Sequence, residues 1–454
     1  MDVSLARRIA YDILLRVEAE QAYAGELLYA RLNDPAARIK SEDAALTTEL
    51  VLGLLRWQRQ LDFLIERQTG RSVGQLDLEV LLALRLGLYQ LRFLTRVPSS
   101  AAVNESVELV KRARKRSAAA LVNAVLRHAP SGPVETLLPA TLPAAARLGI
   151  LHSHTDWMIE RWLARFGEAQ TLALLEANNR PPRLACAILD ESRREQILRE
   201  LEQKRMQPEP GRWLKSALTL RGGNPAITEA FRRGWISIQD EASQIVPHLL
   251  DVRPGQRVLD LCAAPGGKTA LLARAAGEAG RVVAGDVHAH RLRAMTATLK
   301  RLGAGGVQCI VLDGTSPLPF LAVFDRILVD APCSGTGTLA RNPEIRWRLK
   351  LEDLDDLHRR QFALLANALG VLAPGGKLVY STCSLEAEEN EQVVDGVLHN
   401  REDVRPVSGL QAIQPHLREG VHAAEFIGQN GVFRTMPGQH GTDGFFAVVM
   451  ESRR

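Results

Sequence analysis

The sequence has few cysteines and no long apolar run. Its 454 residues include five cysteines, an odd number with no Cys-x-x-Cys spacing, which argues against a disulfide framework and a structural zinc site. No stretch approaches the roughly 18 apolar residues that a membrane span needs. Charged residues interrupt the apolar positions near the N-terminus, unlike those of a signal peptide. We therefore expect a cytoplasmic protein with reduced thiols, no bound metal and no membrane association.

A strong excess of charge of one sign is also missing. The formal net charge is +5, and the segment 1–130, with 19 Lys and Arg against 15 Asp and Glu, holds +4 of it. Five of the six residues 111–116 are cations. Such a run is ordinarily a solvated charged face, but a basic excess also suits a polyanionic partner. Other features of the chain must decide between these interpretations.

The length and the periodicity of the chain predict several domains, because one hydrophobic core stops growing below this size. Apolar residues recur at helical spacing from 5 to 127, and a proline-containing segment with little periodicity follows at 129–143. We predict an all-α domain over 1–135, a small α+β domain over 145–235 and an α/β domain over 236–454.

Short apolar runs alternate with helical segments after Gly234. The runs are 257–261, 281–285, 307–312, 324–329 and 377–381. This alternation predicts parallel strands in a doubly wound sheet, a Rossmann-like arrangement. Ligands of such sheets bind beyond the carboxyl ends of the strands, so the residues that follow each run are the candidates for a site.

The first run leads into a loop with two adjacent glycines and a following helix. The loop reads Asp260, Leu261, Cys262, Ala263, Ala264, Pro265, Gly266, Gly267, Lys268. Glycines let a ligand approach the backbone, and a helix N-terminus offers free N–H groups. The loop lacks the Gly-x-Gly-x-x-Gly spacing of NAD-binding proteins, and Cys262 stands where a P-loop has its first glycine. A plain structural turn is the alternative to a ligand site.

Acidic residues follow four successive predicted strands, at Asp260, Asp286, Asp313 and Asp330. One such aspartate is ordinarily a cap or a turn former. An aspartate at the tip of the second strand can accept hydrogen bonds from ribose hydroxyls. Four in register favour a site for a nucleoside cofactor.

Two cysteines, Cys333 and Cys383, follow the fourth and fifth runs on the same predicted edge. A lone cysteine there is ordinarily a small buried hydrophobic residue. Two thiols beside Asp330 suit covalent chemistry on a pyrimidine, because carbon 5 of cytosine takes up a methyl group only after a thiolate has added to carbon 6. An acid near N3 stabilises the charge that develops, and a base then removes the C5 proton. This chemistry does not rank the two thiols.

Three motifs together resemble the RNA cytosine-C5 methyltransferase family, also called the Nol1/Nop2/Sun family. They are the loop 260–268, Asp-Ala-Pro-Cys-Ser-Gly-Thr-Gly at 330–337 and Ser-Thr-Cys-Ser at 381–384. The resemblance implies S-adenosyl-L-methionine as the cofactor. It places the cofactor against Cys262, Ala263, Ala264, Pro265, Gly266, Gly267, Lys268, Asp286, Asp313 and Asp330. It also makes Cys383 the nucleophile, Cys333 the residue that assists product release, and Asp330 the group facing N3. DNA cytosine methyltransferases use the thiol after proline, so Cys333 stays open as the nucleophile.

The N-terminal segment 121–127 resembles the end of a NusB-type RNA-binding domain. Joined to the methyltransferase motifs, it resembles the Sun-type members that methylate 16S ribosomal RNA, and the segments 178–182, 239–244 and 441–446 also fit. The resemblance implies 16S ribosomal RNA, naked or in a partly assembled small subunit, as the partner and cytosine 967 as the target. It implies no obligate protein partner, and an RNA-binding role for the small domain.

The segment 338–347 contains candidates for RNA contacts. Arg341, Arg346, Trp347 and the adjacent Arg348 suit stacking on an RNA loop or neutralising its backbone, whereas a packed tryptophan among solvated arginines is equally consistent with the sequence. Ala340 stands where the family resemblance leads us to expect another basic residue. A non-catalytic RNA-binding factor with a degenerate methyltransferase fold is the competing function, and the presence of all motif residues disfavours it.

Overall fold

The computed structural model of the chain describes residues 3–34, 39–321, 323–399 and 401–453. The chain forms two compact units. One comprises Met1–Pro181 and Leu339–Leu349, and the other comprises Pro182–Thr338 and Lys350–Arg454. The predicted boundaries of the three domains stay a prediction.

The first unit is helical, as the spacing of its apolar residues predicts. Its α-helices are α1 (Leu5–Ala19), α2 (Ala24–Leu32), α3 (Ser41–Thr69), α4 (Leu78–Phe93), α5 (Ser99–Arg112), α6 (Ala119–Arg127), α7 (Ala144–His152), α8 (Asp156–Asn179) and α14 (Ile345–Arg348). The central helix α4 is apolar on nearly every side, and Leu82, Leu84 and Leu88 are fully buried in one core cluster. α8 bends at Gly167, whose φ of 76° is not helical.

The second unit begins with a small antiparallel sheet of order β2-β3-β1-β4. Its strands are β1 (Leu184–Ile188), β2 (Pro208–Pro210), β3 (Ala217–Leu220) and β4 (Ile236–Ile238). One core cluster joins Cys186 of β1 to Ile197 of α9 (Arg194–Gln203) and to Ala230 of α10 (Glu229–Arg232). A second cluster joins Ala187, which alternates with Cys186 along the strand, to helices of the large sheet.

The large sheet has the order β10-β12-β9-β8-β5-β6-β7, with β11 paired to β12. Its strands are β5 (Arg257–Asp260), β6 (Arg281–Asp286), β7 (Gln308–Val311), β8 (Phe324–Asp330), β9 (Leu372–Thr382), β10 (Val404–Val407), β11 (Phe433–Thr435) and β12 (Phe445–Ser452). The five predicted strands pair in parallel, which confirms the predicted fold class. The strands β10, β11 and β12, which the sequence did not predict, pair antiparallel. The sheet is therefore mixed.

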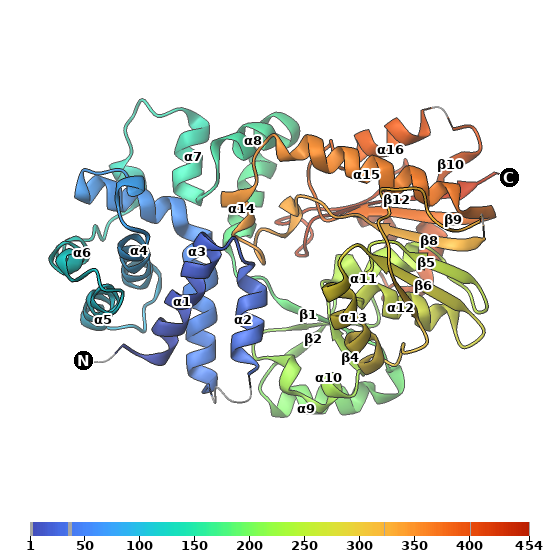
Figure 1. Cartoon of the computed structure of the whole chain (residues 1–454), viewed down its shortest axis with the longest axis horizontal. Helices are drawn as coiled ribbons and strands as arrows, with labels where there is room; N and C mark the ends of the chain where they lie inside the picture. The colour runs from blue at the N-terminus through green and yellow to red at the C-terminus, as the bar shows by residue number, and fades with distance from the viewer. Residues whose placement is uncertain (1–2, 35–38, 322, 400, 454) are drawn as a thin grey trace. The chain divides into compact units, whose positions relative to one another are not determined.

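Helices cover both faces of the large sheet (Figure 1). α11 (Glu241–Leu249), α12 (Gly267–Ala276) and α13 (Ala289–Arg301) pack on one face, and α15 (Asp353–Gly370) and α16 (Glu391–Leu398) pack on the other. The short α17 (Leu410–Ile413) contacts α11. Side chains alternate between the two faces along β8. Leu328 packs in the core under α11 and α12, and its neighbour Ile327 packs in the core under α15 and α16.

None of the described helices is both long enough and apolar enough to cross a membrane.

Candidate active site

Three parallel strands bring the predicted acidic residues to one edge of the large sheet. Asp260 ends β5, Asp286 ends β6 and Asp330 ends β8, as the sequence predicts. Asp313 follows β7 by two residues, and its exposed carboxylate accepts hydrogen bonds from the backbone N–H and the hydroxyl of Thr315. These two bonds lower the pKa of Asp313. Its carboxylate is therefore engaged in a local turn.

The loop after β5 is shaped by glycine and by proline. Gly266 has a φ of +99°, and a Cβ at that position would lie 2.7 Å from the side chain of Met295. The peptide bond between Ala264 and Pro265 is cis. The N–H of Ala263 donates to the carbonyl of Gly285 at 2.9 Å, so the loop is tied to the end of β6 beside Asp286. The glycine-rich loop and the second acidic residue thus belong to one local structure.

Two buried oxygen atoms near this loop have no hydrogen-bond partner among the described residues. They are Oδ1 of Asp260 and Oε1 of Gln239, and the latter lies 3.5 Å from the position that a Cβ on Gly267 would take. Burial raises the pKa of Asp260 to about 7, although the hydroxyl of Thr269 donates to its other oxygen at 2.7 Å. Unpartnered acceptors beside the free N–H groups of a helix start fit a nucleoside cofactor that carries its own donors and a carboxylate.

The side chain of Lys268 is directed toward the end of β8. Its Nζ lies 2.7 Å from Oδ2 of Asp330, and the hydroxyl of Ser381 donates to Oδ1 of the same carboxylate at 2.7 Å. Burial would lower the pKa of Lys268, but the charge and the hydrogen bond of Asp330 outweigh burial and raise it. The ammonium also lies 5.3 Å from the ring centroid of Phe445. The lysine therefore stays cationic.

The two thiols meet beyond the ends of β8 and β9. Asp330 pairs with Ser381 in the parallel register, so Cys333 and Cys383 lie three and two residues past a paired position. Their sulfur atoms are 3.4 Å apart. The hydrogen bond to Cys383, burial and the charge of Glu389 all raise the pKa of Cys333 well above its usual range. Cys333 therefore keeps its proton while Cys383 is its hydrogen-bond partner.

The backbone at Gly337 passes too close to the backbone of Cys383 and Gly444 to carry a side chain. Its N–H donates to the carbonyl of Cys383 at 2.9 Å. A Cβ at this position would lie 2.2 Å from the carbonyl oxygen of Gly444 and 2.8 Å from that of Cys383. Both obstacles are backbone atoms, which do not move aside as a side chain does. Gly337, the second glycine of the 330–337 motif, is therefore required because no larger residue fits there.

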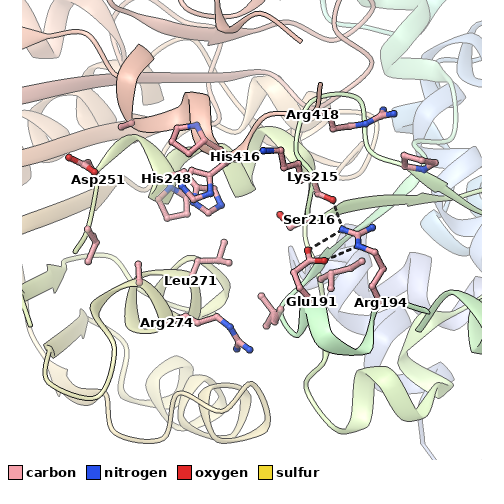
Figure 2. A pocket seen from close by; sticks show the side chains of 18 of the residues that line it. Glu191, Arg194, Lys215, Ser216, His248, Asp251, Leu271, Arg274, His416 and Arg418 are labelled. Atoms are coloured by element: carbon pink, nitrogen blue, oxygen red, sulfur yellow. Dashed lines mark hydrogen bonds and ion pairs between the residues drawn. The ribbon is translucent and has the colours of Figure 1, made fainter. Parts of the chain in front are cut away.

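A cavity of about 900 Å³ elsewhere in the second unit contains none of the sequence-predicted site residues. In Figure 2 the rings of His248 and His416 lie face to face, and Arg194 bonds Glu191 on the opposite wall. Burial lowers the pKa of His248 to about 3, so the ring pair is neutral near pH 7. The chemistry-bearing residues lie at the sheet edge and not in this cavity.

The sequence left Arg346, Trp347 and Arg348 open, either as RNA contacts or as a packed tryptophan among solvated arginines, and the structure shows all three bonded within the first unit. Arg346 is fully buried and donates to carbonyl oxygens of Arg56, Ser153 and Asn178, at 3.0, 3.0 and 2.6 Å. It also donates to the side-chain oxygen of Asn179.

The neighbours of Arg346 are engaged in the same way. Trp347 donates to the carbonyl of Leu55 at 2.8 Å. Arg348 donates to the carbonyl of Val17 in α1 and to those of Gln21 and Ala22 before α2. The expectation of solvated arginines is also wrong, because the guanidinium groups of Arg346 and Arg348 satisfy backbone carbonyls. The carbonyl of Ala340, where we expected a cation, accepts two bonds from Arg56.

Sequence reasoning missed the pairing of Lys268 with Asp330, the unpartnered Gln239 and the buried Glu389. Gln239 lies in a segment that resembles the family, but no spacing assigned it a ligand. Glu389 belongs to the acidic run 386–391, which is typical of a solvated surface. No sequence signal separates the buried Glu386 and Glu389 from the more exposed glutamates beside them.

Comparison with known proteins gives a consistent result along the chain. Residues 247–451 match the family described as 16S rRNA methyltransferase RsmB/F, residues 4–130 match the NusB family, and residues 154–226 match the ferredoxin-like domain of RsmF/B-like methyltransferases.

Full-length relatives are similar over nearly the whole chain. A probable ribosomal RNA small subunit methyltransferase B of Synechocystis is 34% identical, covering 98% of this chain and 99% of the relative. A protein of the same description from Bacillus subtilis is 30% identical over the full length of both chains.

Solved structures agree with the fold. A methyltransferase homologue from Pyrococcus horikoshii is 31% identical, with a TM-score of 0.56, and covers 68% of this chain and 99% of that one. The structure of PH0851 covers 100% of both chains with a TM-score of 0.81, and at 24% identity it supports the fold alone.

Proposed function

Because the chain belongs to the RsmB/F family of 16S ribosomal RNA methyltransferases, we propose that it methylates carbon 5 of a cytosine in 16S ribosomal RNA through a covalent thiol adduct. S-adenosyl-L-methionine is the cofactor, and when bound it supplies an electrophilic methyl group. The target that we propose is cytosine 967. The observation that carries the proposal is the pair of thiols, with sulfurs 3.4 Å apart, beside the ion pair of Lys268 and Asp330.

Cys383 is the proposed nucleophile. Its thiolate attacks C6 of the cytosine, an S–C6 bond forms, and the electrons of the C5=C6 double bond move toward C5 and N3. Charge on Cys383 contributes to the raised pKa of Lys268, so the ammonium stays protonated beside the attacking sulfur. The choice of Cys383 over Cys333 as the attacking group rests on the family resemblance, because the two sulfurs share one hydrogen bond at 3.4 Å.

Asp330 and Lys268 are the proposed groups at N3. The carboxylate is held by the ammonium of Lys268 and by the hydroxyl of Ser381, each at 2.7 Å, so its orientation is set before the base enters. Together the pair provides a hydrogen-bonding partner and a compensating charge as electron density builds on the ring. Electron-rich C5 then accepts the methyl group.

Cys333 is the proposed base for release. Once the sulfur of Cys383 is bonded to C6 it is no longer a thiolate, so the first cause of the raised pKa of Cys333 disappears. Cys333 can then lose its proton to solvent and take the proton from C5. The C5–H electrons re-form the C5=C6 bond, the S–C6 bond breaks, and Cys383 leaves as a thiolate.

Cofactor residues in this proposal are the loop from Cys262 to Lys268, with Asp286, Asp313 and Asp330. The unpartnered oxygens of Asp260 and Gln239 supply further acceptors. The cationic run 111–116 is mostly exposed at the end of α5, which suits contact with RNA phosphates, although Lys111 and Lys115 also pair with Glu108 and Asp77.

Methylation of 16S ribosomal RNA by Cys383→Ala tests the proposal. We expect complete loss of methyl transfer with cofactor affinity near that of the wild type, while the control Cys309→Ala, altered at a strand cysteine of β7, stays active. Bisulfite sequencing of the product RNA reports whether the modified position is cytosine 967. Full activity of Cys383→Ala would overturn the proposed mechanism.

A further inference from the structure

Glu389 is a buried carboxylate in the loop 383–390, which follows β9 and begins with Cys383, and it contacts the loop 331–335, which follows β8 and contains Cys333. Its side chain has no exposed surface. Oε1 accepts hydrogen bonds from the backbone N–H of Ser334 at 2.7 Å and from the side-chain amide of Gln361 at 2.9 Å. Oε2 accepts from the hydroxyls of Ser334 and Ser384. The carboxylate thus binds the residue that directly follows each cysteine.

All four of these donors are neutral groups. Burying a charged carboxylate without a cation is costly, and burial indeed raises the pKa of Glu389. Apolar side chains of the same volume would stabilise the fold more cheaply, so stability alone does not explain a carboxylate here. Two oxygens that each accept two bonds can, however, fix two separate loops at once.

The loops need such a link because the sheet stops before the cysteines. The register of β8 and β9 ends at Asp330 and Ser381, and the chain then leaves both strands. Beyond that point hydroxyl and backbone hydrogen bonds join the loops directly, including those from Gly337 to the carbonyl of Cys383 and from the N–H of Leu385 to the hydroxyl of Thr336. The carboxylate of Glu389 adds the bonds to the residues that directly follow the two cysteines.

Glu389 is itself held in place. Its backbone carbonyl accepts from the hydroxyl of Tyr380 at 2.6 Å, and Gln361 also donates to the carbonyl of Pro332. The link is therefore a fixed part of the structure and does not depend on one mobile side chain.

We propose that Glu389 is a positioning residue that holds Cys333 and Cys383 at the separation needed for one thiol to act after the other. This inference rests on the proposed function, in which Cys333 removes the C5 proton while Cys383 is still bonded to C6. A displacement of about 1 Å in such a site costs about 100-fold in rate. Loosening the link affects release of the product more than binding of either substrate.

Glu389→Gln is the main variant, because the amide keeps the size of the side chain but loses one acceptor oxygen. We expect kcat to fall about 10- to 100-fold, while KM for the RNA and affinity for the cofactor stay within about twofold. We also expect a protein–RNA adduct to persist on unmodified RNA, as in Cys333→Ala. Glu388→Gln, which removes the same charge from the adjacent half-buried residue, is the matched control and is expected to turn over like the wild type.

The double variant Cys333→Ala/Glu389→Gln separates positioning from a general loss of structure. If Glu389 acts through the thiol pair, the double variant releases product no more slowly than Cys333→Ala alone. Two results would overturn the role of Glu389. One is a double variant whose release rate falls by the product of the two single effects, and the other is a wild-type kcat in Glu389→Gln. If Glu389→Gln does not fold, Ser334→Ala and Ser384→Ala each remove one hydroxyl donor and are expected to accumulate the same adduct; rapid release by both would overturn it.

Failure of the proposed function gives a different result. In that case Cys333→Ala forms no adduct and Cys383→Ala still methylates the RNA, whatever the Glu389 variants do. Persistent adduct in Cys333→Ala but none in Glu389→Gln would instead reject the positioning role alone.

Discussion

The ammonium group of Lys268 lies 2.7 Å from Oδ2 of Asp330, although Lys268 belongs to the first turn of α12 and Asp330 ends β8. The lysine belongs to the loop assigned to the cofactor, but its side chain is directed to the carboxylate that we place at N3 of the cytosine. It therefore connects the cofactor loop to the site of chemistry.

Lys268→Met is expected to lower kcat by about 100-fold or more, because a preorganised charged donor at the reacting ring is lost. Affinity for S-adenosyl-L-methionine is expected to fall less than kcat, since the substitution keeps the backbone of the cofactor loop and removes only the ammonium that is paired with Asp330. Steady-state kinetics and calorimetric titration of the cofactor measure the two effects separately. Lys300→Met, at an exposed position of α13, is the control. Equal losses in kcat and in cofactor affinity would place the side chain in cofactor binding instead.

Asp260 predicts a pH dependence of stability in the protein without cofactor. Its pKa is about 7 in the folded protein and 3.8 as the ordinary value. Between these values the folded state binds more protons than the unfolded state, so stability falls as the pH rises from about 4 to 7. Below about pH 4 the Asp260 carboxyl is protonated in the folded and the unfolded protein, and above about pH 7 it is ionised in both. Its contribution to the free energy of unfolding is therefore constant outside this window.

Asp260→Asn removes this contribution. The free energy of unfolding of the wild type, minus that of Asp260→Asn, is expected to decrease between about pH 4 and pH 7 and to be flat above. Urea unfolding at several pH values measures the difference. Parallel curves for the two proteins across the window would show that the carboxyl does not hold its proton in the folded state.

Arg346 is expected to stabilise the helical unit and not to contact RNA. Arg346→Met leaves three buried carbonyl oxygens and one part-buried amide oxygen without their donor, and we expect a loss of about 3 kcal/mol or more in the free energy of unfolding. Lysine is not expected to rescue the variant, because one ammonium does not reproduce the planar fork of donors.

Denaturant unfolding measures the loss, with Arg16→Met as the control. Arg16 forms an exposed ion pair with Glu20, for which we expect an effect of about 0.5 kcal/mol or less. The salt dependence of RNA affinity gives a second readout. The slope of log affinity against log salt concentration is expected to be unchanged in Arg346→Met. A slope reduced by about one unit would show that Arg346 contacts an RNA phosphate.

Local sequence patterns predicted the elements that carry the site. Apolar runs located β5 to β9, and the rule that ligands bind beyond parallel strands selected Asp260, Asp286 and Asp330 together with both cysteines. The rule works because the carboxyl ends of parallel strands share one edge. Those predictions did not depend on knowing any side-chain geometry.

Contacts between residues distant in the sequence were not predictable in this way. Lys268 and Asp330 are 62 residues apart, and Glu389 lies 55 residues from Ser334. The burial of Arg346 depends on carbonyls at the ends of α7 and α8, which no local pattern around residue 346 specifies. The antiparallel strand β12 was missed because its eight residues form an apolar run near the C-terminus without a following helix.

The most direct measurement of the central claim uses 16S ribosomal RNA that contains 5-fluorocytosine at the target position. Fluorine at C5 cannot leave as a proton, so after methyl transfer the S–C6 bond is locked. Incubation with S-adenosyl-L-methionine, digestion and mass spectrometry then identify the cysteine that carries the nucleotide. We predict the adduct on Cys383 in the wild type and in Cys333→Ala, and none in Cys383→Ala. An adduct on Cys333, or an adduct that still forms in Cys383→Ala, would contradict the assignment of Cys383 as the nucleophile.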